Sequence, residues 1–548
     1  MDIKSAFWGI LFVVVVIGAV FVLDVVKTPS EPASLKQLNS VAELSAFLNK
    51  SQNELDVGGM HDTGIRTLAA PTVAAEKSGD TAGATTADFS QTNIQVAGVD
   101  EPDVVKTDGT YIYTRAGSNI VIVRAVPATD AQVVSNITLP GTVNDFFVNG
   151  NKLIAFGYDN YPIHILRTET GTGTGEIAPS QAPVAGETVN PPTPGDTTNQ
   201  VAAGESFARP DFYPRSSNQA FIFVYDITDR TNPTLARNIT LDGSYVDSRM
   251  IDNEVYVIVH QQFFVLGTGN IALPTITSGG KTATLISDVN TYYFDDMPDY
   301  NYQFTTVVSL DVQNDGTPIT TKSFLSGYTS TIYVSQKNIY TTSQKYVNYR
   351  PVIFEKTMDA LPTILPADLA AQVKAIRESG KMKARQYQEI TPLIQNYQNS
   401  LSETARTEFE TAVQRIQDQI NVDLEKEYEK TVIHRIAIEN GNIEPQAEGE
   451  VPGHLLNQFS LDESNGYLRV ATTTSGFGQN QQQKNHVYVL DAGLVHVGAL
   501  EDIAPGESIY AARFLGSRLY LVTFKRIDPL FVIDLADPAN PKILGKLK

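Results

Sequence analysis

The sequence predicts an all-β fold, a β-propeller of four-stranded blades, because one phrase recurs six times along the chain. In each copy a Gly leads an extended run, a tight turn follows, and a second run ends in Tyr or Val before a third closes on Asp. Uninterrupted copies, such as the one from Gly98 to Gly141, have the roughly 40–50 residues of a propeller blade. The leading glycines are Gly98, Gly141, Gly243, Gly327, Gly453 and Gly506.

Within each copy, the run after the Gly is expected to form the innermost strand and the run ending in Tyr or Val the second. The third run closes on an Asp that is followed by turn residues, as in DITDRTNP and DLADPANP, because Asp caps its own turn and Pro fixes φ. These residues are predicted to form turns: Asp226, Asp311, Asp491 and Asp534.

The length and composition support a repeated small unit. The chain has 548 residues, more than the roughly 250–300 at which a single core stops growing. Its net charge of −20 repels phosphate backbones, so nucleic acid is not an expected partner. The absence of Cys excludes disulfides, thiolate metal sites and Cys nucleophiles together.

The N-terminal segment, residues 1–27, is predicted to be a transmembrane helix. Its uncharged apolar run, 7–23, is near the lower limit for crossing a bilayer, and Val25 and Val26 extend it past Asp24. No small-residue cleavage site follows, so residues 7–26 are expected to stay as a single-pass anchor in the cell membrane with the propeller outside the cell. The sequons at Asn49, Asn136 and Asn238 leave glycosylation open.

Residues 28–89 are expected to form a short amphipathic helix and a flexible linker. Leu35, Leu38, Val41, Leu44 and Leu48 recur every three or four residues, as on one face of a helix. Docking of this helix on the propeller is favoured over binding of a partner. The Gly, Ala and Thr content of residues 56–88 predicts a spacer.

The propeller, residues 90–548, carries three predicted insertions. Residues 168–210 read as a disordered loop, and residues 262–303 as a loop with an aromatic and acidic cluster. Residues 364–431 switch to helical periodicity and predict a helical hairpin, with helices over 367–379, 381–398 and 400–430. Ser400 and Glu403 fit a capping box. A heptad stripe favours self-packing of this hairpin: Phe409, Val413, Ile416, Ile420 and Leu424.

Four long phrases, at 92–113, 449–473, 504–524 and 527–548, are similar to segments of one family. It comprises secreted or membrane-anchored archaeal and bacterial proteins with a C-terminal β-propeller domain distantly related to WD repeats. The resemblance implies the fold and an envelope location, and it implies no activity. It also implies about two further blades. Six units therefore close a ring, or the six are truncated from about eight, or a second polypeptide completes them, and truncation is favoured.

Candidate ligand-binding residues were sought on the inner strands, which line the central channel of a propeller. The strand assignment places five polar residues there: Asp103, Asp145, Arg249, Gln458 and Arg513. Their mixed charge suits a small polar ligand, although a ring of buried, mutually satisfied pairs is the commoner outcome.

A weak metal site is also conceivable at Asp100, Glu101 and Asp103, since three carboxylates within four residues offer hard oxygen ligands. The favoured alternative is a set of turn caps with an ion pair to Lys106 or Arg513. The sequence shows no cofactor motif and no paired His spacing, GxSxG elbow or Walker loop. A non-catalytic, membrane-tethered extracellular scaffold for a protein or envelope component is therefore the leading hypothesis. The alternative is an envelope hydrolase or lyase that uses channel carboxylates.

Overall fold

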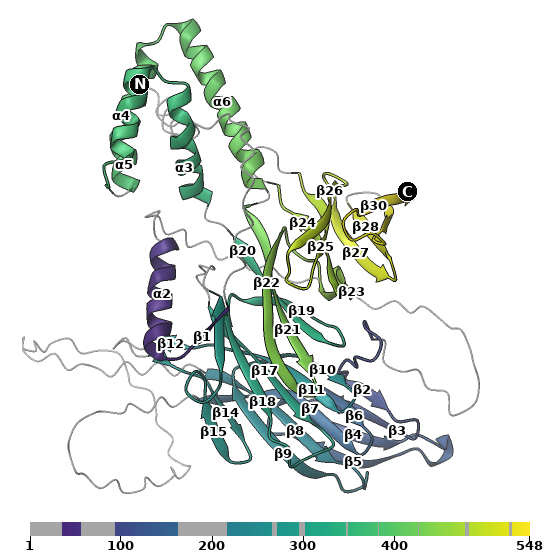
Figure 1. Ribbon diagram of the computed structural model, residues 1–548. Coiled ribbons are helices and arrows are strands. Elements are labelled where there is room, and N and C mark those ends of the chain that lie inside the picture. Colours follow the sequence, from purple (N-terminus) through teal and green to yellow (C-terminus); the bar gives the residue numbers. More distant parts are fainter. Residues whose placement is uncertain are drawn as a thin grey trace, which may run out of the picture.

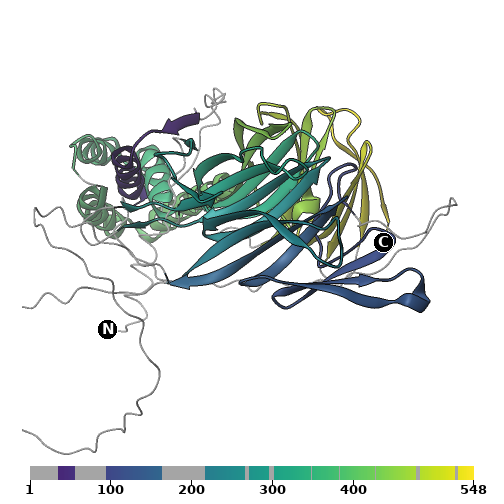
Figure 2. The ribbon, with the colours of Figure 1, turned by 90° about the horizontal axis from the view of Figure 1, so that it is seen from below.

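The computed structural model describes residues 35–55, 94–162, 216–265, 271–294, 302–346, 349–381, 383–425, 427–476, 482–524 and 529–547. Six sheets follow one another along the chain. In each of them four core strands form an antiparallel meander, in which every strand pairs with the core strand that precedes it in the chain. Figures 1 and 2 show the sheets side by side in chain order, with a group of helices projecting from one side. The six predicted units are therefore correct, and we call them blades 1 to 6.

The strands of the first three blades are as follows. Blade 1 contains β2 (Val105–Thr107), β3 (Tyr111–Ala116), β4 (Asn119–Arg124) and β5 (Gln132–Thr138). Blade 2 contains β6 (Thr142–Asn149), β7 (Lys152–Pro162), β8 (Ser216–Asp226) and β9 (Thr234–Asp242). Blade 3 contains β10 (Ser244–Ile251), β11 (Glu254–Gln261), β17 (Gln303–Asp311) and β18 (Thr320–Ser326).

The other three blades repeat this order. Blade 4 contains β19 (Thr329–Val334), β20 (Asn338–Tyr346), β21 (Glu429–Glu439) and β22 (Asn442–Pro452). Blade 5 contains β23 (Leu461–Ser464), β24 (Tyr467–Thr474), β25 (Lys484–Leu490) and β26 (His496–Ile503). Blade 6 contains β27 (Ser508–Leu515), β28 (Arg518–Phe524), β29 (Leu530–Asp534) and β30 (Lys542–Leu547).

The segment 262–303, predicted to be a loop, instead contributes strands to two blades. β14 (Thr275–Ser278) pairs with β9 at the outer edge of blade 2, and β15 (Lys281–Thr284) follows it. β16 (Thr291–Phe294) pairs in parallel with β18 of blade 3, and a short pair, β12 (Phe264–Val265) and β13 (Ile271–Ala272), precedes these strands. The outer edges of blades 2 and 3 would be unpaired without these strands, so they provide pairing partners for this segment. A local sequence pattern does not reveal partners that are distant in the chain.

The predicted amphipathic helix begins later than expected. Leu35 to Leu38 form β1 (Leu35–Leu38), which pairs with β16, and the helix α2 covers Val41–Leu55. Ser40 ends the strand because its hydroxyl accepts from the Glu43 amide at 3.1 Å, while Glu43 accepts from the Asn39 amide at 2.9 Å. Ser40 therefore caps α2, while Glu43 accepts from the amide one residue before the cap rather than from that of Ser40, as it would in a capping box. The helix docks on the propeller, where Phe47 contacts Tyr293 edge to face at 4.9 Å.

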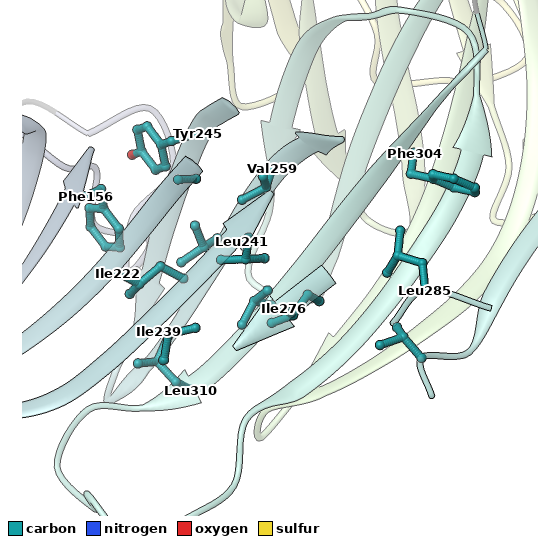
Figure 3. Packing of buried hydrophobic residues seen from close by; sticks show 14 of the residues in the cluster. Phe156, Ile222, Ile239, Leu241, Tyr245, Val259, Ile276, Leu285, Phe304 and Leu310 are labelled. Atoms are coloured by element: carbon teal, nitrogen blue, oxygen red, sulfur yellow. The ribbon is translucent and has the colours of Figure 1, made fainter. Parts of the chain in front are cut away.

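Each neighbouring pair of blades buries its own hydrophobic cluster. Figure 3 shows the largest, between blades 2 and 3, where Ile222 and Leu241 face Val259 and Leu310. Four further clusters join blades 1 to 2, 3 to 4, 4 to 5, and 5 to 6. Since full burial of one such side chain contributes roughly 1.5–3 kcal/mol, these sheet-to-sheet interfaces supply most of the driving force for folding.

The recurring glycines lie where the chain crosses from the outer strand of one blade to the inner strand of the next. The amides of Gly243, Gly453 and Gly506 each donate at 2.7 Å to a carbonyl at the start of the third strand: those of Asn218, Glu429 and Gln483. At Gly243 a Cβ would lie 2.2 Å from the His260 carbonyl oxygen. The recurring Gly in the sequence therefore marks a point where two backbone segments approach each other so closely that no side chain fits between them.

The Asp residues that close the third strands form the predicted turns. Asp226 accepts from the Thr228 amide at 2.9 Å, and Asp311 from the Gln313 amide at 2.9 Å. Asp491 and Asp534 do the same for Gly493 and Ala536. Such Asx turns explain why this residue type recurs at these positions.

A helical arm occupies the connection between β20 and β21. It comprises α3 (Tyr349–Ala360), η2 (Leu361–Thr363), α4 (Ala367–Arg377), α5 (Lys383–Ser400) and α6 (Glu403–Glu425). It begins earlier than the predicted boundary at 364, because Met358 of α3 and Leu361 of η2 pack into the same small core as Phe409, Val413 and Ile416. The cap of α6 is Ser402, whose hydroxyl accepts from the Ala405 amide at 3.3 Å, whereas Ser400 bonds back to Tyr397. Self-packing of the stripe is confirmed.

We expect the arm to be dispensable for folding of the propeller. Tyr346 and Glu429 are directly paired across β20 and β21, so a short Gly-Ser linker can replace residues 347–428. Loop length affects closure entropy only weakly, and the stability of the propeller should change by about 1 kcal/mol or less. Circular dichroism during thermal unfolding should show lost helical signal and a retained cooperative β transition. Aggregation of the variant would show that the arm belongs to the propeller core.

Several predicted segments lie outside the described residues. They include the anchor at 7–26, the spacer at 56–88 and the loop at 168–210. Within the part of the chain that the structure describes, no helix combines the length and apolar character needed to cross a membrane.

Candidate functional site

The inner strands of blades 2 and 3 bring a carboxyl and a phenol together. Asp145 lies on β6 and Tyr245 on β10, and the Tyr245 hydroxyl donates to Asp145 Oδ1 at 2.8 Å. The same hydroxyl lies 2.9 Å from Ser248 Oγ. Both strands carry a β-bulge next to these residues, between Val143 and Asp145 and between Tyr245 and Asp247. A bulge increases local twist and turns the following side chain, which is a common device at functional sites.

The ionisation of Asp145 is strongly perturbed. Burial raises the pKa of its carboxyl to about 7, and the nearby charge of Asp247 adds to this effect. The hydrogen bond from Tyr245 and the charges of Arg249 and Arg115 act in the opposite direction but do not offset the burial. The pKa of the fully buried Tyr245 phenol is raised well above its usual range by burial and by Asp145. At neutral pH the Asp145 carboxyl is therefore close to half protonated.

Arg249 connects blade 3 to blade 5. Its guanidinium donates to Asp247 Oδ1 at 2.6 Å, to the Ser248 carbonyl at 2.7 Å and to Gln458 Oε1 at 3.1 Å. Glu101 lies 3.9 Å away. Burial alone lowers the pKa of Arg249, but Asp247 and Glu101 more than offset this and the net shift is upward. Arg249 and Gln458, two of the residues predicted to reach the channel, thus lie side by side, and their interaction is largely a mutual one.

Arg513 differs from Arg249, because no residue in the described part of the chain forms an ion pair with it. It lies on β27 with its guanidinium carbon 3.4 Å from the ring centroid of Phe459, which belongs to the short helix η3 (Gln458–Ser460). Burial lowers its pKa, while Glu101 acts in the opposite direction. No hydrogen bond or ion pair joins Arg513 to another described residue. A guanidinium stacked on a ring with free N–H groups is suited to binding a carboxylate or another planar anion.

Asp103 is not part of this group. Its carboxylate accepts from the amide of Val104 at 2.6 Å, and its backbone pairs with Phe146 of β6. The two other carboxylates of the predicted metal site have their own partners. Asp100 pairs with Lys106 at 2.9 Å, and Glu101 accepts from the Gln95 amide at 3.3 Å. Among the described residues, no three His, Cys, Asp or Glu side chains gather as metal ligands do. The cation site thus has no support there, and the favoured ion pair with Lys106 is present.

Sequence reasoning missed Tyr245 and Asp247, although both follow the recurring Gly243 in the phrase SYVDSRM. The position of Asp145 four residues after Gly141 matches that of Asp247 after Gly243, so a comparison of the repeats pairs the two carboxyls. The bulges next to these residues have no signature in the sequence.

The sequence also did not predict the contacts of the segment before β2. Gln95 donates to the Gln458 and Leu461 carbonyls, and Gln336 donates to the Ala97 carbonyl. Residues 95–103 therefore lie across the inner strands of blades 2 to 5.

A second polar group lies at the edge of blades 4 and 5. Glu429, at the start of β21, is buried and accepts from His454 Nδ1 at 2.8 Å and from the Ser475 amide at 2.9 Å. Burial raises the pKa of Glu429, but the two partners more than offset it and the net shift is downward. The arrangement fixes the orientation of a half-exposed imidazole.

Comparison with known proteins agrees with this architecture. The family described as Beta propeller domain matches residues 89–548. The chain belongs to this family. An uncharacterized protein of Methanocaldococcus jannaschii is 28% identical over 467 residues, covering 84% of this chain and 62% of that protein. A second uncharacterized protein, from Archaeoglobus fulgidus, is 28% identical over 547 residues, covering 98% of this chain and 77% of its own length. The chain thus spans less than two thirds of the first of these relatives.

Solved structures show only a loose likeness to this chain. An apocarotenoid oxygenase mutant from Synechocystis is 8% identical, with 81% of this chain and 70% of that chain covered at a TM-score of 0.29. The WD40 domain of SCAP from fission yeast is 8% identical, with 80% of this chain and 86% of that chain covered at a TM-score of 0.19.

Proposed function

We propose that the protein is a non-catalytic binding scaffold of the cell envelope, tethered to the membrane by residues 7–26 with the propeller outside the cell. The partner is a protein or another envelope component. The apolar run in the sequence supports the tether, and the strongly acidic, Cys-free composition suits an extracellular domain. The binding role is supported by the placement of the insertions.

One observation carries this proposal: the long insertions of four consecutive blades all occupy the same connection. In blades 2 to 5 the chain leaves the second strand at Pro162, Gln261, Tyr346 and Thr474 and returns at Ser216, Gln303, Glu429 and Lys484. The crossing glycines Gly243, Gly453 and Gly506 bond to residues beside these return points, so the connections share one face of the propeller. Insertions gathered on one face of a repeat protein are typical of a binding face.

The helical arm projects from this same face. Figure 1 shows α3 to α6 standing away from the sheets, and their own hydrophobic core keeps them rigid without help from the blades. Its base is fixed to blade 5 by Glu425, which lies 2.9 Å from Lys484. Ion pairs from Arg377 to Glu355 and Asp359 join α4 to α3. A preorganised projection of this kind lowers the entropic cost of binding a partner.

The location can be tested with protease. We expect trypsin added to intact cells or spheroplasts to degrade the propeller, with cleavage beginning in residues 56–88. Full protection until the membrane is ruptured would place the propeller inside the cell and would contradict the proposed location.

The binding role can be tested with three versions of the protein from residue 35 onward, which keeps β1 and α2 on the propeller. The unmodified domain, the variant with residues 347–428 replaced by a linker, and an Arg513→Gln variant should be compared for capture of envelope components. Each captured component is then purified and its Kd measured. Loss of binding with the arm replacement alone would assign the contact to the arm. The proposal fails if the unmodified domain binds no purified component.

A second candidate function, hydrolysis of an envelope polysaccharide or peptide, is favoured by one observation. Asp145, with its raised pKa of about 7, interacts electrostatically with Asp247 in the channel. A carboxyl whose pKa lies near neutral, close to a second carboxyl, is an arrangement that general acid and base catalysis can use. Reducing-end release and peptide cleavage should be assayed with the purified domain. Turnover that Asp145→Asn abolishes and Asp103→Asn preserves would favour the enzyme over the scaffold.

A further inference from the structure

We infer that a buried layer of polar side chains between blades 3 and 4 binds a neutral ligand rich in hydroxyl groups, of the kind that one sugar residue of an envelope glycan presents. The inference rests on the proposed scaffold role only for the source of the sugar. We call these side chains the polar layer. They come from β11, β17, β18, β19 and β20 and are His260, Gln303, Thr305, Ser326, Thr329 and Ser343.

The strand registers place the polar layer on the facing sides of the two blades. Residues opposite each other in an antiparallel pair share one face of the sheet. Three such pairs make up the layer: His260 with Thr305, Gln303 with Ser326, and Thr329 with Ser343. The first two pairs belong to blade 3 and the third belongs to blade 4.

The polar layer continues the hydrophobic cluster that joins these blades. Ile258 and Val307 lie two residues from His260 and Thr305 along their strands, and both pack in that cluster. The hydroxyl oxygens of Thr305 and Thr329 lie 3.0 Å apart and connect blade 3 to blade 4. The layer therefore lies inside the interface, at the strand ends where the chain enters and leaves the insertions.

Three atoms of the polar layer have no hydrogen-bond partner in the part of the chain that the structure describes: Gln303 Nε2, Ser343 Oγ and His260 Nε2. Gln303 is only 5% exposed and Ser343 only 1%. A buried polar atom without a partner lowers stability, so such atoms usually bond to water or to a ligand. Because the three atoms belong to side chains around one pair of Thr hydroxyls, a single bound molecule can supply their partners.

A His between blades does not need to leave a ring nitrogen unpartnered. His486 of β25 lies in the interface of blades 4 and 5, where it stacks on Tyr488. Its Nε2 atom lies 3.0 Å from Thr474 Oγ1, and its Nδ1 atom accepts from the Asp502 amide at 3.3 Å. The unpartnered Nε2 atom of His260 is therefore a particular feature of the polar layer.

The polar layer suits an uncharged ligand. Burial lowers the pKa of His260 to about 4, so its imidazole is neutral at pH 7 and its Nε2 atom donates or accepts according to the tautomer. Charged groups on the same face of blade 4 have their own partners, since Lys345 lies 3.1 Å from Glu450 and His434 lies 3.0 Å from Glu448. A ligand hydroxyl both donates and accepts, as an amide N–H, a hydroxyl and an imidazole require.

An exposed aromatic ring borders the polar layer. Tyr328, between β18 and β19, is 66% exposed, and its ring contacts the His260 ring edge to face with centroids 5.6 Å apart. Binding sites commonly combine aromatic surface with a few placed hydrogen-bonding groups, and a sugar ring has an apolar C–H face that packs on an aromatic ring. The Tyr328 ring and the half-buried His260 mark the side from which the ligand enters.

The probes for the test are four free neutral sugars, namely glucose, galactose, mannose and N-acetylglucosamine, with glucuronate as a charged comparator. Each is added to the full chain while the NMR signals of the His rings are followed, and a His260→Gln variant identifies the His260 signal. We expect at least one neutral sugar to bind with a Kd on the order of 1 mM and to shift the His260 signal. The His486 signal should stay unchanged.

Two pairs of matched variants locate the site. Gln303→Leu removes the unpartnered amide, and its control is Gln261→Leu, because Gln261 is also buried with an unpartnered Nε2 atom but lies opposite Phe304 on the face toward blade 2. Tyr328→Ala removes the exposed ring, and its control is Tyr510→Ala, which is 65% exposed on blade 6. Gln303→Leu should weaken sugar binding about tenfold or more and Tyr328→Ala about threefold, while each control changes the Kd by less than about twofold.

Three outcomes overturn the inference. The first is an unchanged His260 signal with every sugar at roughly ten times the expected Kd, which would leave water as the partner of the layer. The second is sugar binding that neither Gln303→Leu nor Tyr328→Ala weakens. The third is tighter binding of glucuronate than of glucose, which would contradict an uncharged ligand. Since Tyr328 is exposed, its variant tests the site even if Gln303→Leu does not fold. The scaffold proposal fails separately, when no purified envelope component binds.

Discussion

Replacing Gly243 by Ala should destabilise the propeller by about 3–5 kcal/mol, among the largest effects expected for a single methyl group in this chain. Gly243 has φ +123°, a conformation that residues with a Cβ rarely adopt, and the added Cβ would lie 2.2 Å from the His260 carbonyl oxygen. The nearest atom belongs to the backbone, so it does not yield without breaking the pairing of β10 with β11. The crossing from blade 2 to blade 3 would then be distorted.

Guanidinium unfolding followed by circular dichroism measures this effect. Gly516→Ala is the matched control, because Gly516 also has a positive φ, +56°, but no atom lies within 4 Å of the added Cβ. It should cost about 1 kcal/mol, the penalty for a left-handed residue with a Cβ. Equal losses in the two variants would show that backbone conformation alone, and not the close approach between blades, explains the recurring glycine.

The sequence predicted the features of the fold that each blade repeats. The crossing glycines and the Asp turns recur because every blade meets the same local constraint, as at Gly453 and Asp491. The pattern failed where a segment joins a distant edge. Leu35 pairs with Phe294, and no local pattern can show that β1 will find β16 rather than continue the helix that begins at Val41.

The candidate site was predictable only in part, for a similar reason. Arg249 lies on the inner strand β10, as its position after the recurring Gly predicts, whereas Gln458 lies in η3, before the inner strand β23 begins at Leu461. The contact of Tyr245 with Asp145 depends on two β-bulges, and a bulge changes which face a side chain occupies. A strict alternation of inward and outward residues therefore mispredicts this part of the channel. Arg513 was placed correctly, but its stacking on Phe459 required the short helix η3, which the phrase HLLNQFS did not indicate.

The buried Asp145 carboxyl also affects how the stability of the protein depends on pH. An acid whose pKa rises on folding is more easily ionised in the unfolded chain than in the folded one. Burial of Asp145 therefore opposes folding at neutral pH, unlike the turn-forming Asp226, whose pKa is lowered by its bond to the Thr228 amide. Natural proteins tolerate such local penalties mainly where activity or binding requires them.

Replacing Asp145 by Asn should therefore stabilise the protein at high pH and leave it nearly unchanged at low pH. The carboxyl has a pKa of about 7 when folded and 3.8 as its ordinary value, so its contribution is most favourable below pH 3.8 and is lost as the pH rises through 7. A shift of this size corresponds to roughly 4 kcal/mol, and partial access of water reduces the expected gain to about 2 kcal/mol above pH 7. Asn keeps an oxygen that accepts from the Tyr245 hydroxyl, so the contact is retained. Guanidinium unfolding at a series of pH values from 4 to 9 measures the difference, with the exposed Asp130→Asn as control. A constant difference across this range would contradict the assigned ionisation of Asp145 and remove its support for acid catalysis.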